Sequence, residues 1–536
     1  MLDGVSRKKS RKKKRKCSPA RTRRPKTRRA DVDPLEGYAA RRRKKKKVTC
    51  KRRKKKRPAT RAPSGAPAPL IAAPPPPAPP AAAAIQSPIS VYAGGFTAKE
   101  AERLLWRAGF GPSPGWAQAL SGMGLARAVQ SLTRPEGAAV MTGSAPVLPN
   151  GAALSPEDAF GHDHLSWLDR MVRTSQPFVE RMALIWHDWF ATSNAEVGSQ
   201  RQMLAQCELF RTYGRGSFLE LVGRVTQDPA MIVWLNQNQN RVGRVNENYA
   251  RELMELFTLG ADRGAYTETD VRELARALSG WTNSFSSELG NYNFRYDPAR
   301  HDDGTKTVFG TSGNFGWEDA YRMCVRHPMH ASFFVPKLWS YFVPTPMPEA
   351  DRRRLEASYV SSGYQVRPCV EAILMHPDFY RGPRLIKPPV VLAAGMLRAI
   401  RRGIDTPEWT SVCEQAGQRL FYPPDVAGWD DTRWLDTSTT RGRWLMVRRA
   451  LLGRNVETTS TQLAYSNSES PAAALDAART FWADPSLTAE TVSSLSGFAA
   501  ECLPSVMTAS EQHINRAMRQ NALRQLIYSS PDLQTS

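Results

Sequence analysis

The sequence has little of what marks several common protein classes. Its 536 residues include only seven Cys, at wide spacings and without a C-x-x-C pair, which excludes a disulfide framework and a zinc-finger pattern. No run of eighteen apolar residues occurs, so no membrane-spanning helix is predicted. The apolar stretch at 69–85 is interrupted by Pro, so a secretory signal is hard to find there and the compartment stays open.

The signatures of the best-known catalytic sites are also missing. The chain contains no G-x-S-x-G, no H-E-x-x-H, no P-loop and no Rossmann fingerprint. The sequence therefore does not predict an α/β-hydrolase serine, a zinc-protease helix or a nucleotide-binding loop.

Acidic residues are nearly absent from one end of the chain. Residues 1–61 hold 30 of the 75 Lys and Arg and only 4 of the 50 Asp and Glu, a formal charge of +26. The remainder holds 45 basic and 46 acidic residues, a charge of −1. We expect 1–62 to be a disordered arm, because it has too few apolar residues to form a core.

Two interpretations of the arm stay open. It binds a polyanion such as nucleic acid, anionic lipid or an acidic wall polymer, or it is a solvated tail without a dedicated ligand. Tyr38 is its only aromatic residue, so contact with nucleic acid would be nonspecific and to phosphate. Residues 63–90 are rich in Pro and Ala, which predicts an extended linker.

Helical periodicity dominates the rest of the chain. We expect a mainly α fold, a large multi-helix bundle-like domain over 91–455 with a C-terminal helical extension of the same domain over 456–536. A short β-containing insertion is expected near 285–315, where N-Y-N-F-R-Y-D-P alternates.

Several helix starts can be placed from local chemistry. Thr97 with Glu100 and Thr267 with Asp270 have the spacing of capping boxes. Asp228 before Pro suits an N-cap followed by Pro at the first helical position.

The stretch from Val245 to Trp281 is the most informative part of the chain. It predicts one helix that ends at Gly260 and a second that starts at Thr267, packed against each other. Asn248, Glu252 and Glu255 would share one face of the first helix.

This stretch also resembles a known bacterial family, called domain of unknown function 1800. The resemblance rests on N-E-N-Y-A-R-E-L-M-E-L-F-T-L-G and Y-T-E-T-D-V-R-E-L-A-R-A-L-S-G-W, and it recurs in L-L-W-R-A-G-F-G, P-F-V-E-R-M-A-L-I-W-H-D-W-F, D-P-A-M, H-D-D-G-T-K-T-V-F-G and F-Y-P-P-D-V-A-G-W. These motifs cover roughly residues 95–455. The resemblance implies the family but no established reaction. Relatives are often exported, which implies a role in an envelope process.

The chain departs from the family at one motif. Relatives have a pattern close to W-H-N-H-F, whereas this sequence has W-H-D-W-F at 186–190. Trp189 thus stands where relatives have a second His. If relatives use both His as metal ligands, this chain has lost one of them.

Two short motifs supply further candidate residues. Glu180 and His187 lie seven apart, on one helix face, where they can share a metal or a proton. The alternative is an orienting hydrogen bond inside a packed bundle. His162 and His164 are interpreted as polar boundary residues.

The loop that begins at His301 is the most site-like short motif. It combines His301 and Asp302 with a second carboxylate, a Gly and Lys306. The alternative interpretation is a turn stabilised by Asp302 and Lys306.

Two hypotheses from different classes follow. The first is a metal-assisted or carboxylate/His hydrolase-like enzyme, with Glu252 and Glu255 as acid/base or as ligands of a possible divalent metal, and His187 and His301 assisting. Its small-molecule substrate is unknown. It predicts that these residues meet in a water-accessible cleft.

The second hypothesis is a noncatalytic binding or assembly protein, tethered to a polyanion by the basic arm. It predicts buried, mutually paired charges and an exposed apolar or basic patch. Glu252 and Glu255 would then belong to a buried network with Arg251, Arg272 and Arg276.

Overall fold

The described part of the chain is mainly helical, as predicted. The computed structural model describes residues 86–457, 469–502 and 508–536, which belong to one compact unit spanning 72–536. The strands of these residues form only two small antiparallel sheets. The predicted arm at 1–62 and linker residues 63–85 lie outside the described residues. No described helix has the length and apolar character needed to cross a membrane.

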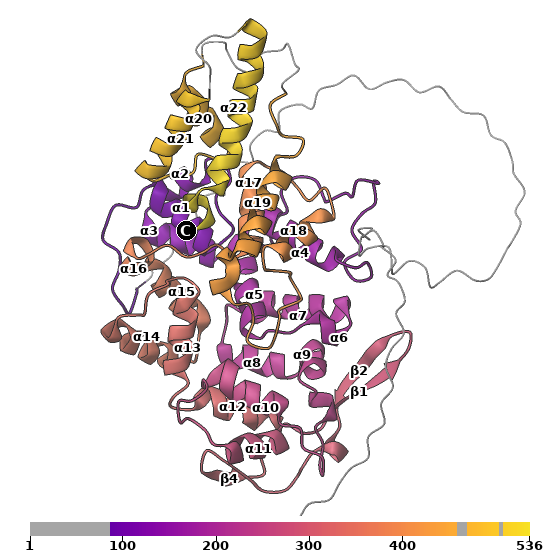
Figure 1. Cartoon of the computed structure of the whole chain (residues 1–536). Helices are drawn as coiled ribbons and strands as arrows, with labels where there is room; N and C mark the ends of the chain where they lie inside the picture. The colour runs from indigo at the N-terminus through magenta and orange to yellow at the C-terminus, as the bar shows by residue number, and fades with distance from the viewer. Residues whose placement is uncertain (1–85, 458–468, 503–507) are drawn as a thin grey trace, which may run out of the picture. The chain divides into compact units, whose positions relative to one another are not determined.

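The helices before the central stretch are labelled in Figure 1. They are α1 (Ala98–Arg107), α2 (Trp116–Ser121), α3 (Leu125–Thr133), α4 (His162–Arg173), α5 (Pro177–Trp189), α6 (Asn194–Val197), α7 (Gln200–Tyr213), α8 (Phe218–Thr226), α9 (Pro229–Trp234) and a 3-10 turn (Gln237–Gln239). Within this group, α5 packs against α3, α4 and α7.

The central stretch and the β insertion follow. They comprise α10 (Asn248–Glu252), a π-helix (Leu253–Thr258), α11 (Glu268–Ala277), β1 (Trp281–Ser286), β2 (Gly290–Tyr296), a 3-10 turn (Pro298–Arg300), β3 (Lys306–Val308) and β4 (Thr311–Gly313). In the first sheet, Trp281 pairs with Tyr296, and β3 packs against α11. The insertion predicted near 285–315 is thus observed at 281–313.

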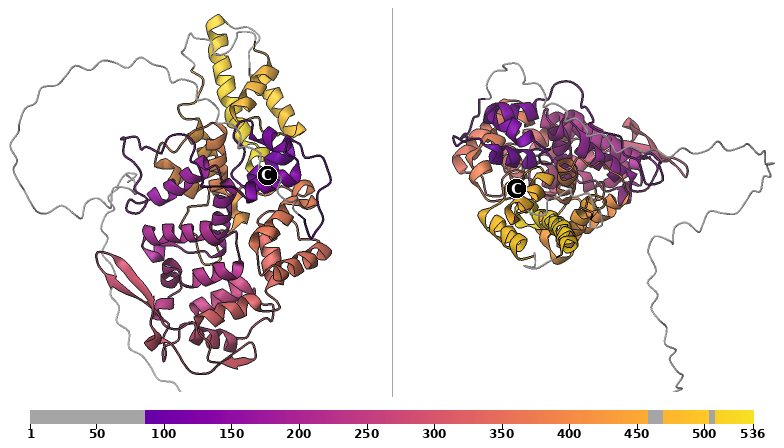
Figure 2. Two further views of the ribbon diagram at one scale, coloured as in Figure 1. Left: turned by 180° about the vertical axis from the view of Figure 1, so that it is seen from behind. Right: turned by 90° about the horizontal axis from the view of Figure 1, so that it is seen from above.

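The remaining helices complete the described chain. They are α12 (Trp317–Arg326), α13 (Ala331–Ser340), α14 (Glu349–Ser361), α15 (Val366–Met375), α16 (Pro377–Arg381), α17 (Pro389–Ala399), α18 (Glu408–Gln415), a 3-10 helix (Asp431–Leu435), α19 (Thr437–Leu451), α20 (Pro471–Phe481), α21 (Ala489–Glu501), α22 (Ala509–Ser529) and α23 (Pro531–Gln534). Helices α20, α21 and α22 lie side by side (Figure 2).

The helix starts predicted from local chemistry are confirmed. Thr97 and Glu100 form a capping box at α1, and Thr267 and Asp270 form one at α11. The Asp228 side chain accepts a hydrogen bond from the third residue of α9. These caps satisfy backbone N–H groups that have no partner within the helix.

The single helix predicted from Asn248 to Gly260 is wrong in its second half. The chain is α-helical only to Glu252 and then widens into the π-helix. The backbone N–H groups of Leu259 and Gly260 both donate to the carbonyl of Met254, at 2.8 and 3.1 Å. Gly260 has φ +87°, the left-handed conformation expected for a helix end. π-Helical turns are rare and often lie at functional sites.

Aromatic side chains from the end of α5 form the centre of the core. The rings of Trp186, Trp189 and Phe190 lie 5.7, 5.8 and 6.1 Å from the ring of Phe218, measured between centroids. The indole N–H of Trp189 donates to the carbonyl of Phe257 at 3.1 Å. Trp189 therefore joins α5 to the π-helix.

Buried arginines cap the carbonyl ends of several helices. One amino group of Arg398 donates to the carbonyls of Met171 and Val172, at 3.1 and 2.9 Å, in the last turn of α4. Arg402 makes the same kind of contact with Ala450 in α19, at 2.9 Å. The last carbonyls of a helix lack intrahelical partners and carry partial negative charge. A single guanidinium can therefore join one helix to the end of another.

Candidate functional site

Glu180 lies on α5 and is only 1% exposed. The indole N–H of Trp167 donates to Oε2 at 2.9 Å, and Nε–H of Arg211 lies 2.9 Å from both carboxylate oxygens. Nε–H of Arg170 donates to Oε1. Glu180 thus bonds two guanidinium groups and one indole. The positive charges of the two arginines compensate its buried negative charge, as burial of a carboxylate requires.

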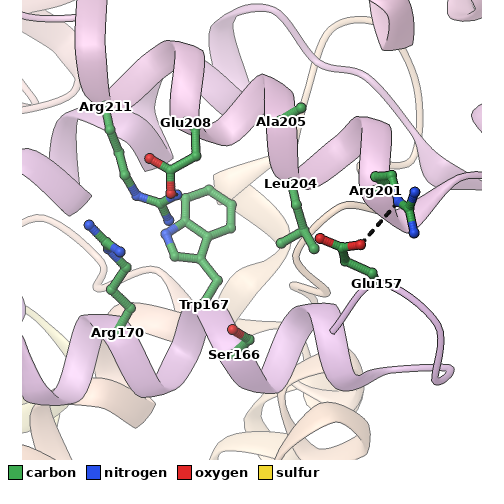
Figure 3. A pocket seen from close by; sticks show the side chains of 9 residues that line it. All are labelled: Glu157, Ser166, Trp167, Arg170, Arg201, Leu204, Ala205, Glu208 and Arg211. Carbon is green, nitrogen blue, oxygen red and sulfur yellow. Dashed lines mark hydrogen bonds and ion pairs between the residues drawn. The ribbon is translucent and has the colours of Figure 1, made fainter. Parts of the chain in front are cut away.

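A groove lies between α4 and α7 beside this cluster (Figure 3). Its volume is about 370 Å³. Trp167, Arg170 and Arg211 line one end of the groove, and Arg201 and Glu157, which lie 3.0 Å apart, line the other. Glu180 is not part of the lining, but it bonds three of the lining side chains.

His187 is buried about two turns after Glu180 on α5, and no hydrogen bond joins these two described side chains. Trp167 contacts both, because it donates to Glu180 and its ring lies 5.4 Å from the imidazole. Nε2 of His187 accepts the backbone N–H of Phe421 at 3.0 Å. Burial lowers the pKa of His187 to about 3, so the ring is neutral at pH 7.

A second buried histidine binds the adjacent backbone amide. Nδ1 of His164 accepts the N–H of Leu420 at 3.1 Å. Burial lowers the pKa of His164 to about 3 as well. The boundary position predicted for His164 is wrong, because this side chain is completely buried. Helices α4 and α5 therefore each supply one imidazole to two consecutive backbone amides, that of Leu420 just before the motif F-Y-P-P-D-V-A-G-W and that of Phe421 at its start.

That motif has a strained first residue and is held by two further contacts. Phe421 has φ +67°, a left-handed conformation that costs free energy in a residue other than Gly. Its carbonyl accepts the backbone N–H of Asn194 at 2.8 Å. At the other end of the motif, Oδ1 of Asp188 accepts the N–H of Trp429 at 2.8 Å. The strained backbone persists because these contacts hold it on both sides.

Asp188 also forms a polar cluster that the sequence analysis did not select. The phenol of Tyr341 donates to Oδ2 at 2.7 Å, and burial raises the pKa of the carboxyl group. Nζ of Lys337 donates to the carbonyl of Leu256 in the π-helix at 2.8 Å and lies 4.3 Å from the ring centre of Trp189. Burial lowers the pKa of Lys337 to about 8. Only the fold brings these residues together, so no local signal could have identified them.

Glu252 and Glu255 have different surroundings from Glu180. Both are half-buried, and neither makes a hydrogen bond or ion pair with another described residue. The pKa of Glu252 is raised to about 6, first by burial and second by the nearby Glu255 carboxylate, while Arg251 opposes both effects. Burial and Glu255 together raise the pKa of Tyr266 to about 12. Asn248 is exposed at the start of α10.

The Arg–Glu network expected between the two central helices uses other carboxylates. Arg251 lies 2.8 Å from Glu268 and 3.2 Å from Glu247. This network links α10 to α11, but it is not the buried network with Glu252 and Glu255 that was expected. It lies near the surface and omits Glu252 and Glu255.

The loop at His301 has the contacts of a turn. Asp302 accepts two hydrogen bonds from Arg276, at 2.8 and 3.0 Å, and this contact is the main cause of its lowered pKa. The ammonium of Lys306 donates to the carbonyl of Asp302. Nδ1 of His301 lies 2.9 Å from the carbonyl of Ser279. These contacts support the turn interpretation of the motif.

The candidate residues thus lie in three separate groups, and no hydrogen bond or ion pair joins one group to another. The groups are Glu180 and His187 around Trp167, Glu252 and Glu255 beside Tyr266, and His301 and Asp302 beside Arg276. Among the described residues, no three His, Cys, Asp or Glu side chains gather in a group that could hold a metal ion.

Comparison with known proteins agrees with the motifs. A search of curated proteins and a search of solved structures found no match. The model of the family described as "Protein of unknown function (DUF1800)" matches residues 103–535, which is most of the chain. The chain therefore belongs to the DUF1800 family.

Proposed function

We propose that this chain is a hydrolase-like enzyme in which Glu252 and Glu255 carry out general acid–base catalysis. The observation that carries the proposal is that these two neighbouring, half-buried carboxylates have no hydrogen-bond or ion-pair partner among the described residues. Carboxylates with a structural role are normally paired, as Glu180 and Asp302 are.

The environment of Glu252 suits a proton donor. A pKa of about 6 keeps roughly a tenth of Glu252 protonated at pH 7, and more below it, whereas an ordinary Glu is almost fully ionised there. The change from α-helix to π-helix between Glu252 and Glu255 adds support, because such turns often accompany function.

The proposed reaction needs two proton transfers. Glu255 as carboxylate takes a proton from a water molecule that attacks the substrate, and protonated Glu252 gives its proton to the leaving group. Tyr266, whose raised pKa keeps it protonated, donates a hydrogen bond to the substrate. Among the described residues, neither carboxylate belongs to a group of three or more possible metal ligands, and we assign both a role in proton transfer.

The test is a panel of chromogenic esters, glycosides, phosphate esters and anilides, measured with the full chain. We expect one class to be hydrolysed, and Glu252→Gln and Glu255→Gln each to lower kcat/KM by about 100-fold or more. Glu220→Gln on α8 is the matched control, since Glu220 is half-exposed and pairs only with Arg224.

Two results would contradict the proposal. One is that no substrate is hydrolysed faster by the native chain than by the Glu252→Gln/Glu255→Gln double variant. The other is that the activity tracks bound metal, measured by mass spectrometry, and survives both single substitutions.

A second candidate function is noncatalytic binding to a polyanion through residues 1–62. The separation of a +26 arm from a remainder of charge −1 favours it. Phe285 and Leu289 at the turn of the β1–β2 hairpin are 72% and 64% exposed and add an apolar surface.

Measuring binding to duplex DNA and, separately, to anionic lipid vesicles would show which of these two polyanions the arm binds. We expect affinity to fall steeply as salt rises and to disappear when residues 1–62 are deleted. Binding that is insensitive to salt, or that survives the deletion, would contradict this function.

A further inference from the structure

We propose that the groove between α4 and α7 binds a neutral saccharide unit. The groove is separate from Glu252 and Glu255, so this inference goes beyond the proposed function and does not depend on it. Its volume of about 370 Å³ falls within the range of about 300–1,000 Å³ typical of small-ligand sites.

The charges of the groove are balanced. Its lining contains three arginines and two glutamates, and Glu180 behind the lining supplies the third carboxylate. The net charge of the site therefore attracts a small ion only weakly. A site for a charged ligand usually carries an excess of the opposite charge. This balance favours a ligand without net charge.

The polar groups at one end offer both donors and acceptors. Arg170 bonds Glu180 through Nε, and neither of its amino groups has another bond to a described residue. Glu208 accepts from Arg211 through Oε1 at 2.7 Å, which leaves Oε2 free, and its side chain is 60% exposed. Neighbouring hydroxyl groups can donate to Glu208 and accept from Arg170 at the same time. A polyol satisfies both, whereas an anion satisfies only the arginines.

The middle of the groove is mainly apolar, although Ser166 on α4 also lines it. Leu204 points toward Trp167 between the two helices, and Ala205 lies beside it on α7 (Figure 3). A pyranose ring has an apolar face of C–H groups between its polar edges. The order of the lining, with charged pairs at both ends and apolar side chains between them, matches that pattern.

Glu180 holds three side chains of the groove in place before a ligand binds. Because it is buried and bonds Trp167, Arg170 and Arg211 together, these side chains lose little conformational freedom when a ligand binds. We therefore assign Glu180 a positioning role here. It does not touch the ligand.

Titration calorimetry of the full chain tests the proposal with four probes: maltose, cellobiose, N,N′-diacetylchitobiose and inorganic phosphate. We expect saturable binding of at least one disaccharide, with Kd below about 10 mM, and none of phosphate. Glu208→Gln and Arg170→Met should each weaken binding roughly tenfold, the effect of losing about one hydrogen bond to a charged group. Ala205→Phe should abolish binding by filling the groove.

The matched controls are Glu220→Gln and Arg224→Met, which alter an exposed Arg–Glu pair on α8 outside the groove. They should bind as the native chain does, and thermal melting should show that every variant is folded. The proposal is overturned if no disaccharide binds, if phosphate binds and Arg170→Met removes it, or if folded Ala205→Phe still binds the sugar. None of these results depends on hydrolytic activity, so they are distinguishable from failure of the proposed function.

Discussion

His187 accepts a hydrogen bond from the backbone N–H of Phe421, 234 positions later in the chain, at 3.0 Å. Since Nε2 is the acceptor, the neutral ring carries its proton on Nδ1. His164 has the opposite tautomer, because its acceptor is Nδ1. Two neutral imidazoles with fixed tautomers thus hold the strained start of the F-Y-P-P-D-V-A-G-W motif against α4 and α5.

Replacing His187 by Leu should destabilise the protein by about 1–3 kcal/mol. The substitution leaves the buried N–H of Phe421 without an acceptor, and an unsatisfied buried donor carries its full desolvation cost. Urea unfolding measures the difference. His162→Leu is the control, because the bond from Ser155 N–H to His162 is only partly buried, and it should cost less than about 1 kcal/mol. Equal losses in the two variants would contradict this role.

The two buried histidines should make the fold sensitive to acid. Their pKa values are about 3 in the folded protein and about 6.5 when unfolded, so the unfolded state binds more protons between those values. Stability is therefore complete above pH 6.5 and falls as the pH drops toward 3, by about 1.4 kcal/mol per pH unit for each His.

Urea unfolding of the native chain and of His164→Gln at pH 7, 6 and 5 measures this effect. The variant should lose stability less steeply with acid than the native chain. Identical slopes would show that His164 does not titrate on unfolding.

Glu180→Ala should cost about 3–5 kcal/mol. It removes the buried carboxylate that pairs with Arg211, whose side chain is only 8% exposed and would keep only the exposed Glu208 as an ion-pair partner among the described residues, and a buried charge that loses its main partner is strongly destabilising. Glu220→Ala breaks an ion pair whose two side chains are about half-exposed and should change stability by less than about 1 kcal/mol. Thermal unfolding of both variants checks the difference. A folded Glu180→Ala protein with native stability would refute the buried cluster.

Glu252→Gln should stabilise the protein in alkali. The pKa of Glu252 is raised by burial to about 6, so the folded state binds its proton more tightly and loses stability as the pH rises from about 4.5 through 6. The variant should gain about 1 kcal/mol over the native chain at pH 8, after allowance for solvent screening, and nothing at pH 4. Chemical unfolding of the variant and the native chain at both pH values measures this difference. An equal gain in the free energy of unfolding at pH 4 and pH 8 would contradict the raised pKa.

Local sequence chemistry predicted much of the fold. The capping boxes at Thr97 and Thr267, the N-cap at Asp228 and the turn at Gly260 were all predictable, because each depends on residues within a few positions. The π-helix after Glu252 was not, since apolar spacing does not distinguish it from a continued α-helix.

The candidate site was less predictable. Glu180 and Glu252 look alike in sequence, as helix-borne carboxylates beside apolar residues, yet Glu180 meets Arg211 across two helices and Glu252 meets no partner. The groove beside Trp167 and the cluster around Asp188 gave no local signal either, because each is assembled from helices or loops distant in the chain.

The sequence by itself determined the family, the helical class and the ends of many helices, because motifs and caps are local and act through neighbouring backbone groups. Only the tertiary structure decided which charged side chains are paired and which are free. Pairing depends on the direction in which each side chain leaves its helix and on which distant helix packs against it, as His187 and Phe421 show.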